Sequence, residues 1–216
     1  MEKIKNIRKR LRHQRSVRRR KLGLSTPTQI ICVSFIIVIA LGTLLLTLPI
    51  ASRHGRLDVL NAMFTATSAT CVTGLVVRDT WTQFTWFGQA VVLLLIQVGG
   101  LGLVTLTSFF ALAMRRRMGF RDLRLLGESV SADGYDQAKN VLKIVVGLAA
   151  MFEGIGILLL MFAFVPQFGL EGVWISVFTA ISAFCNAGFD LFGRFGAYSS
   201  LVPYVNNYYV QAVIIF

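Results

Sequence analysis

The sequence predicts an all-α membrane protein built from two parallel repeats, and three observations lead to this prediction. Hydrophobic residues make up 55% of the 216 residues and charged residues 15%, whereas a soluble domain carries about 45–50% and about 25%. Long apolar runs alternate with polar segments along the chain, and a 13-residue motif occurs twice. The composition therefore argues against an ordinary soluble protein and against a disordered one.

The chain begins with a basic tail, residues 1–25. Residues 1–21 hold 11 Lys and Arg and one acidic residue, which accounts for +10 of the formal net charge of +12. We expect this tail to lie against anionic lipid. No nucleic-acid partner is expected, because the tail has no aromatic residue to stack on bases. Its length, and the full-length apolar run behind it, argue against a signal peptide.

The first apolar run, Ile30 to Leu48, has the length and borders of a membrane-spanning helix. It holds no charge over 19 positions, follows Ser25-Thr26-Pro27 and is followed by Pro49. A span needs about 20 mostly apolar residues, and a capping residue before a proline is typical of a helix start.

Three further apolar runs follow the first. Residues 84–114 carry no charge until Arg115, and residues 144–165 are broken only by Glu153. A fourth run begins near Tyr204 and ends after too few apolar residues to cross a bilayer. We therefore expect the sequence to be a fragment whose last helix is incomplete.

The basic residues predict the orientation. Residues 1–25 and 114–143 hold 18 Lys and Arg, against four in the remaining polar segments. An excess of these residues marks the cytoplasmic side, so the N-terminus is expected there, in the plasma membrane of a multi-pass protein. The predicted parts are a basic cytoplasmic tail (1–25), a first repeat (26–114), a cytoplasmic loop (115–137) and a second repeat (138–216).

The repeated motif carries the structural argument. Residues 63–75 align with residues 177–189, and seven of the 13 positions are identical. Each copy follows a span and a proline and precedes an aromatic-rich stretch and another span. Two spans separate the copies, so both have the same orientation, unlike the inverted repeats of many secondary transporters.

Each repeat is predicted to contain a short re-entrant helix, over residues 57–68 and 171–182. About 12 residues are too few to cross the bilayer. The small, glycine-bearing segments that follow, residues 71–74 and 185–188, have irregular backbone. At membrane depth such backbone survives only where it is buried in protein or lines a wet path.

These segments offer a ring of backbone carbonyls to an ion. Glycine permits unusual backbone angles, the preceding helix points its negative end at the centre, and carbonyl rings can replace the hydration shell of potassium. Within these loop segments no Asp or Glu stands before the glycines, so a monovalent cation is favoured, held by backbone carbonyls only. The predicted filter residues are Val72, Thr73, Gly74, Leu75, Asn186, Ala187, Gly188 and Phe189.

The known carbonyl filters use four loops, whereas this chain shows two. Either two more repeats follow Phe216 or two chains combine, and we expect the former. The fold is then two helix–pore loop–helix repeats, half of a four-repeat potassium-channel-like pore.

Other polar residues have two interpretations each. Glu153 lies inside a span, where ionisable residues are usually functional. We expect it to support the filter, although a protonated side chain at a helix contact fits equally well. Asp190 and Asp79 follow the two glycines and either concentrate cations or serve as structural residues. The glycines of residues 97–102 are expected to allow close helix packing and not to bind a nucleotide, because no strand precedes them.

Three motifs in this order resemble the Trk/Ktr/HKT superfamily of cation transporters: residues 67–75 (TSATCVTGL), 96–102 (IQVGGLG) and 182–190 (SAFCNAGFD). The helix directly after a basic tail, ending in Leu48-Pro49-Ile50, is most similar to the Ktr membrane subunit. The resemblance covers residues 24–216, but only the first half of a family member.

The resemblance implies four repeats around one pore, a homodimer, and a cytoplasmic ring of nucleotide-binding regulatory subunits. The family has a central glycine in each filter loop, which Gly74 and Gly188 match. In plant relatives a serine at the first position accompanies sodium transport, so Gly74 favours potassium, with sodium left open as a coupling ion.

The expected function is therefore potassium uptake down the electrochemical gradient. Two alternatives stay open: a sodium-selective or non-selective cation transporter of the same fold, and a non-conducting membrane assembly subunit. The residues form no hydrolase arrangement, since His13 lies in the tail and His54 in an outer loop, so no enzyme and no cofactor are expected.

Overall fold

The computed structural model describes residues 27–115 and 133–215, which are helical apart from short connections and one isolated bridge between Ser52 and Phe84. The all-α class is thus confirmed for these residues. The chain forms two units, residues 1–38 and 39–216. In the first unit the described residues are the opening turns of α2. The elements are α2 (Pro27–Leu46), η1 (Pro49–Ala51), α3 (Val59–Thr70), α4 (Thr80–Gln83), α5 (Trp86–Arg115), α7 (Asp133–Phe168), α8 (Leu170–Phe184), η2 (Phe192–Phe195), η3 (Val202–Tyr204) and α9 (Tyr208–Ile215).

Helix α2 begins at Pro27, as the sequence predicts, because a proline at the first helical position gives up no intrahelical hydrogen bond. It ends at Leu46, two residues before the end of the apolar run, and Pro49 then opens η1. The hydroxyl of Thr47, the first residue after the helix, donates to the carbonyl of Leu44 at 2.8 Å. A side chain thus satisfies one of the carbonyls at the helix end, a feature that apolar composition does not reveal.

Two helices are too short to cross a membrane. Helix α3 has 12 residues and α8 has 15, about 18 and 22 Å at 1.5 Å per residue, against a hydrocarbon core of about 30 Å. Their bounds differ from the predicted 57–68 and 171–182 by one or two residues. Both helices continue two residues past the predicted end, up to the caps at Cys71 and Cys185.

Helices α5 and α7 are the long helices of the second unit. Within the described residues, the segment Lys143–Phe168 of α7 is long and apolar enough to cross a membrane, while Trp86–Gly102 of α5 is a shorter apolar stretch. Helix α7 begins eleven residues before the apolar run at residue 144. A helix satisfies its own backbone in water and in lipid alike, so hydropathy marks only its apolar part.

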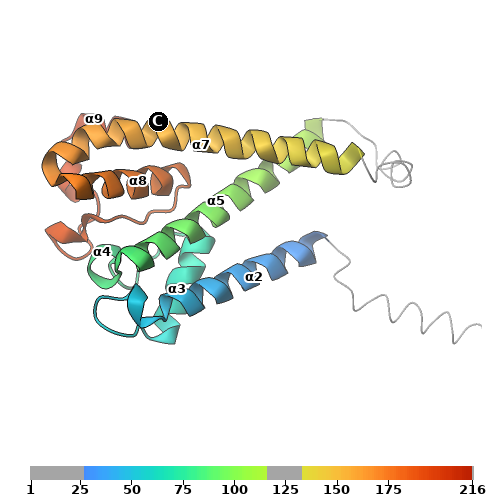
Figure 1. Ribbon diagram of the computed structural model, residues 1–216. Helices are drawn as coiled ribbons and strands as arrows, with labels where there is room; N and C mark the ends of the chain where they lie inside the picture. The colour runs from blue at the N-terminus through green and yellow to red at the C-terminus, as the bar shows by residue number, and fades with distance from the viewer. Residues whose placement is uncertain (1–26, 116–132, 216) are drawn as a thin grey trace, which may run out of the picture. The chain divides into compact units, whose positions relative to one another are not determined.

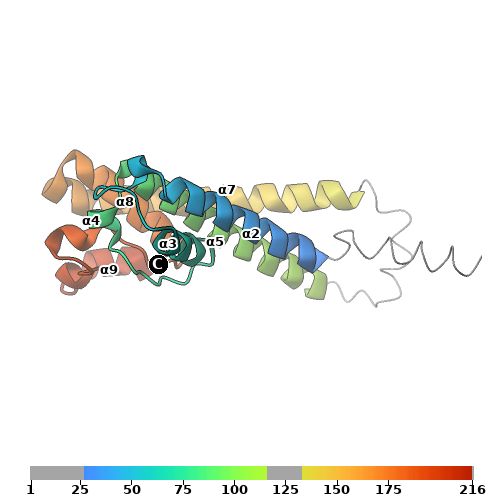
Figure 2. The same ribbon diagram turned by 90° about the horizontal axis from the view of Figure 1, so that it is seen from below.

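Helix α8 turns back along α7, as Figures 1 and 2 both show. Gly169, with φ +60, makes the turn, after Pro166 near the end of α7. A Cβ atom at Gly172 would lie 2.5 Å from the carbonyl oxygen of Phe164. Glycine therefore allows the two helices of this hairpin to pack closely.

Helix α5 connects the repeats, because it packs against both α3 and α8. Outside the helices, the segments around Ser52 and Phe84 are tied together by backbone bonds, including Arg53 N–H to Gln83 O (2.8 Å) and Thr85 N–H to Ala51 O (3.0 Å). These bonds fix the two ends of the segment that carries α3.

Candidate ion-binding site

The segments that follow the two short helices lie against each other. We call residues 71–75 the first loop and residues 185–189 the second loop. A Cβ atom at Gly74 would lie 3.0 Å from the carbonyl oxygen of Ala187, and one at Gly188 would lie 3.1 Å from the Cα atom of Gly74. The two glycines singled out by the sequence are therefore in close backbone contact.

Each short helix ends in the same hydrogen-bonded cap. At the end of α3 the N–H of Val72 donates to Ala69 O (3.3 Å) and the N–H of Thr73 donates to Ser68 O (3.0 Å). The residues 114 positions later make the same two bonds at the end of α8, at 2.9 and 2.8 Å. This pair of bonds is the Schellman motif, so the repeat holds at the level of single backbone bonds.

Every second residue of each loop has a positive φ. The values are 55° for Val72 and 70° for Gly74, and 54° for Asn186 and 72° for Gly188. A β-branched residue such as valine rarely adopts this conformation, which costs about 1–3 kcal/mol where it is imposed. In an extended chain successive carbonyls point to opposite sides, so left-handed residues at alternate positions can bring several carbonyl oxygens to one side.

The loops are held by different side chains. In the first repeat the hydroxyls of Ser68 and Thr73 lie 2.9 Å apart and share a hydrogen bond. In the second repeat Ser182, which matches Ser68, donates its hydroxyl to the carbonyl oxygen of Phe189 at 2.5 Å. One lone pair of that carbonyl is therefore occupied. The Phe189 side chain is buried, whereas that of Leu75, its counterpart, is exposed.

Two adjacent glycines of α5 receive the ends of both short helices. A Cβ atom at Gly99 would overlap the carbonyl oxygen of Thr70, the last residue of α3. One at Gly100 would lie 2.5 Å from Sγ of Cys185, which caps α8. The close packing expected of this glycine-rich segment is thus directed at the starts of the two loops.

Glu153 lies on α7 close to this glycine pair. Nε2 of Gln97 donates to both of its carboxylate oxygens, at 2.8 and 3.0 Å. Among the described residues, no lysine or arginine pairs with it. The role of Glu153 as a support for the filter stays a prediction. Its partner Gln97 also accepts a hydrogen bond from Cys185, the first residue of the second loop.

Asp79 makes hydrogen bonds to two segments of the chain. Its carboxylate caps α4 by accepting from the N–H of Thr82 at 2.8 Å, and it also accepts from the N–H of Tyr198 at 3.1 Å. A Cβ atom at Gly193 would overlap its Oδ1. Asp79 thus links the segment that follows the first loop to the segment that follows the second. Aspartate is a preferred N-cap residue.

Asp190 follows the second loop directly. Its carboxylate accepts from the N–H of Phe192 at 2.9 Å. Burial raises the pKa of Asp190, an effect opposed by hydrogen bonds from Phe192 and Ser200 and reinforced by the nearby charge of Asp79. Desolvation disfavours the ionised carboxyl, and the hydrogen bonds from Phe192 and Ser200 favour it.

A buried glutamine near the start of α5 was not anticipated from the sequence. Gln89 accepts from Nε1 of Trp174 on α8 at 2.8 Å and donates to the carbonyl of Phe84 at 3.2 Å. Trp86 stacks on Trp174, with ring centroids 5.6 Å apart. The triplet Gln-Ala-Val at residues 89–91 recurs at 211–213, a second repeat signal that could have indicated this position.

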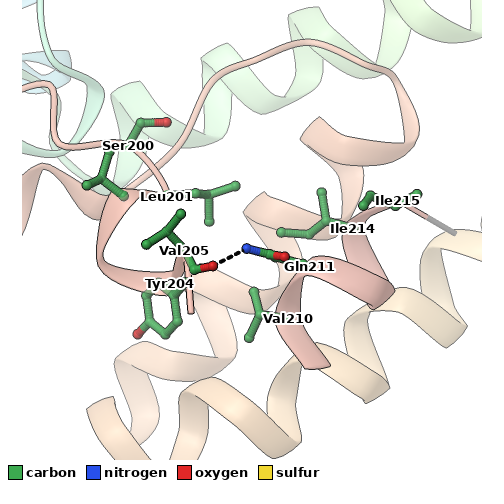
Figure 3. Close-up of a pocket in the computed structure, with 9 residues that line it drawn as sticks. Ser200, Leu201, Tyr204, Val205, Val210, Gln211, Ile214 and Ile215 are labelled. Carbon is green, nitrogen blue, oxygen red and sulfur yellow. Dashed lines mark hydrogen bonds between the residues drawn. The ribbon is translucent and has the colours of Figure 1, made fainter. Parts of the chain in front are cut away.

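The surface hollow in Figure 3 lies apart from the two loops. It has a volume of about 370 Å³ and is bordered by η3 and α9, including Tyr204, Val210 and Ile214. Gln211 donates across it to the carbonyl of Val205. None of the predicted filter residues borders it, and its walls are mainly apolar.

Comparison with known proteins decides the family. The family model TrkH, described as a cation transport protein, matches residues 4–216. The chain belongs to the TrkH family of cation transport proteins. The resemblance noted in the sequence is therefore confirmed, the chain is that of a membrane protein, and the TrkH family is one of transporters rather than enzymes.

Several curated proteins are similar in sequence to this chain over most of the chain's length. It is 38% identical over 192 residues to "Ktr system potassium uptake protein B" of Bacillus subtilis, covering 88% of this chain and 42% of that protein. It is 36% identical over 190 residues to "Potassium/sodium uptake protein NtpJ" of Enterococcus hirae, covering 87% and 41%. The chain thus spans about two fifths of the length of these relatives.

Proposed function

We propose that this chain supplies two of the four pore loops of a potassium uptake protein in the plasma membrane. Potassium would be held by backbone carbonyls of Val72, Thr73 and Gly74 in the first loop, and of Asn186, Ala187 and Gly188 in the second. Leu75 and Phe189 complete the two loops, with the Phe189 carbonyl partly engaged by Ser182.

The observation that carries the proposal is the contact between two equivalent loops. Gly74 and Gly188 approach within van der Waals distance, and the caps and left-handed residues around them match one to one. Two loops related in this way can present oxygens to one common axis. Four such loops would surround a dehydrated ion, as in known carbonyl filters.

The name of one relative suggests sodium as a second transported ion. One relative is named a potassium uptake protein and another a potassium/sodium uptake protein. Potassium and sodium carry the same charge, so the backbone oxygens of the loops cannot distinguish the two ions by charge. A sodium-conducting or non-selective transporter of the same fold is therefore the second proposal, and ion competition separates it from the first.

The proposed assembly is a membrane subunit within a larger system, as the name of the Bacillus relative suggests. We propose a homodimer that binds a cytoplasmic ring of nucleotide-binding regulatory subunits. The N-terminus would be cytoplasmic, and its basic tail, residues 1–25, would contact anionic lipid. That tail lies outside the described residues.

Uptake by cells tests the pore against a non-conducting assembly subunit. The gene would be expressed in bacteria that lack their own potassium uptake, and rubidium or potassium influx measured with sodium as competitor. Gly188→Asp should abolish influx, because the side chain displaces the first loop and puts a charge at the ion path. Gly55→Asp is the matched control, since Gly55 also has a positive φ (+88) but no atom within 4 Å of its Cβ position.

The outcomes are distinct. Loss of influx in a correctly folded Gly188→Asp variant, with influx kept in Gly55→Asp, supports the pore. Normal influx in folded Gly188→Asp protein would remove the second loop from the ion path, and no influx in folded unmodified protein would leave only the assembly role. Equal influx of sodium and potassium in the unmodified protein would replace potassium selectivity by the non-selective alternative.

A further inference from the structure

Three polar side chains from three helices meet behind the second loop. Gln97 of α5 donates through Nε2 to both carboxylate oxygens of Glu153 on α7, at 2.8 and 3.0 Å. The thiol of Cys185, the C-cap of α8, donates to Oε1 of Gln97 with a sulfur–oxygen distance of 3.9 Å. Gln97 therefore uses both ends of its amide and lies at the centre of the cluster.

The burial of Glu153 fixes the orientation of the Gln97 amide. Glu153 is 8% exposed, and no lysine or arginine of the described residues pairs with it. Buried carboxylates are costly unless hydrogen-bonded, and here the donor is the Gln97 amide. Because the amide nitrogen faces the carboxylate, the amide oxygen is turned towards Cys185, which fixes the direction of the side chain.

Cys185 is confined on its other side by α5 itself. A Cβ atom at Gly100 would lie 2.5 Å from Sγ of Cys185, so the thiol rests on the helix backbone close to Gln97. Cys185 directly precedes Asn186, which has a φ of 54°. A shift of Cys185 is therefore passed to the left-handed residue that begins the irregular part of the second loop.

We propose that Gln97 is a positioning residue that sets the place of the second loop, and through it the preference for potassium over sodium. This inference rests on the proposed function of the loops as an ion filter. In this proposal Gln97 acts through Cys185 and not as an ion ligand. It links Glu153 to the start of the second loop, and the position of the loop carbonyls governs which dehydrated ion they match.

The first loop is not held in this way, which makes the effect specific to one loop. Cys71, the counterpart of Cys185, is exposed. The end of its helix lies against the backbone of Gly99. Changing Gln97 should therefore act directly on the second loop and reach the first only through the contact of Gly188 with Gly74.

The test combines ion selectivity with a readout that needs no transport. The full membrane protein would carry Gln97→Leu, Gln97→Asn, or the exchange Gln97→Glu with Glu153→Gln. Influx is measured for potassium and sodium, and the modification of Cys185 by a small methanethiosulfonate reagent is followed by mass spectrometry of its peptide. Gln89→Leu is the matched control, because Gln89 is also a buried amide on α5 but pairs with Trp174.

We expect Gln97→Leu to lower the potassium-over-sodium preference about fivefold, because the loop oxygens lose their fixed position. Cys185 modification should rise about threefold as its local protection falls. Gln97→Asn, shorter by one methylene, should behave in the same direction. The exchange variant should restore both values, since an amide still faces a carboxylate and an oxygen at position 97 still faces Cys185.

The proposal is overturned if folded Gln97→Leu and Gln97→Asn keep both the wild-type ion preference and the wild-type Cys185 modification, or if Gln89→Leu changes both to the same extent. A failure of the proposed function looks different, because the unmodified protein then moves no ion while Cys185 modification still reports on Gln97. Size-exclusion profiles of each variant identify misfolded protein, and the exchange variant keeps the test decisive if a single change does not fold.

Discussion

Gly188 faces Gly74 so closely that a β-carbon on Gly188 would lie 3.1 Å from the Cα atom of Gly74. Both glycines also have left-handed backbone, with φ of +72° and +70°. Two separate constraints, backbone angle and available space, thus require glycine at each position. The contact joins segments 114 residues apart, so it positions one repeat against the other at the proposed ion path.

A change of Gly188 to alanine conflicts with both the backbone angle and the available space at this position. Gly188→Ala has to adopt an unfavourable φ, at about 1–2 kcal/mol, and must also push the first loop aside. We expect ion influx to fall by about tenfold or more, since a displacement worth about 1.4 kcal/mol in the barrier is already tenfold in rate. The measurement is rubidium influx normalised to the amount of protein in the membrane.

Gly55→Ala is the control for the backbone angle alone. Gly55 has φ +88° and open space around its Cβ position, so its substitution costs conformational energy without moving a neighbour. We expect influx within about twofold of the unmodified protein, as its site lies outside the loops. An equal loss in both variants would show that strain, and not the contact with Gly74, limits transport.

Gly99 should be the least tolerant position of α5. A Cβ atom there would overlap the backbone carbonyl of Thr70, which cannot rotate away as a side chain would. Gly99→Ala must separate α3 from α5, and overpacking of this kind costs about 1–3 kcal/mol. Thermal unfolding in detergent should therefore shift to lower temperature.

Gly154→Ala on α7 gives the opposite expectation. Nothing lies within 4 Å of its Cβ position, and alanine is favoured over glycine within a helix by up to about 1 kcal/mol. Its unfolding temperature should be unchanged or higher. If Gly99→Ala were as stable as Gly154→Ala, the close approach of α3 and α5 would be disproved.

Asp79 should stabilise the segments that follow the two loops together. Asp79→Ala removes the cap of α4 and the acceptor for the Tyr198 N–H, and loss of a cap costs about 0.5–2 kcal/mol. We expect faster hydrogen exchange in two separate segments, residues 79–84 and 193–200. Asp58→Ala is the control, because Asp58 is the N-cap residue of α3 but makes no side-chain capping bond. Faster exchange around α4 alone would argue against the link between repeats.

Much of the fold could be predicted because the chain repeats itself. The matched Phe-Thr-Ala motif located both short helices to within two residues, since the same small residues end in the same cap. The left-handed Val72 could not be predicted from its own type, because β-branched residues avoid this conformation. Only its alignment with Asn186, a residue that tolerates positive φ, points to it.

The side-chain contacts between helices could not be predicted from the sequence for a different reason. The pairing of Gln97 with Glu153 depends on the rotation of α5 and α7 about their own axes, which hydrophobic residues on all sides of both helices do not specify. The same holds for Gln89 and Trp174. In contrast, Asp79 could have been recognised as a candidate cap, because aspartate is a preferred N-cap residue.

The pKa of Asp190 predicts a specific dependence of stability on pH. Burial raises this pKa above the ordinary value of 3.8, so the folded protein keeps a proton that the unfolded chain has released. The contribution of the protonated Asp190 carboxyl to the free energy of unfolding is fully present below pH 3.8. It is lost as the pH rises through the pKa that Asp190 has in the folded state.

Asp190→Asn isolates this contribution, because the amide keeps an oxygen for the Phe192 N–H but cannot ionise. The stability of the variant relative to the unmodified protein should therefore increase from acidic to neutral pH and then level off, since only the unmodified protein must bury a charge there. Urea unfolding of both proteins in detergent across this range measures the difference. A constant difference at all pH values would contradict the predicted shift, because a carboxyl with the same pKa in both states contributes no slope.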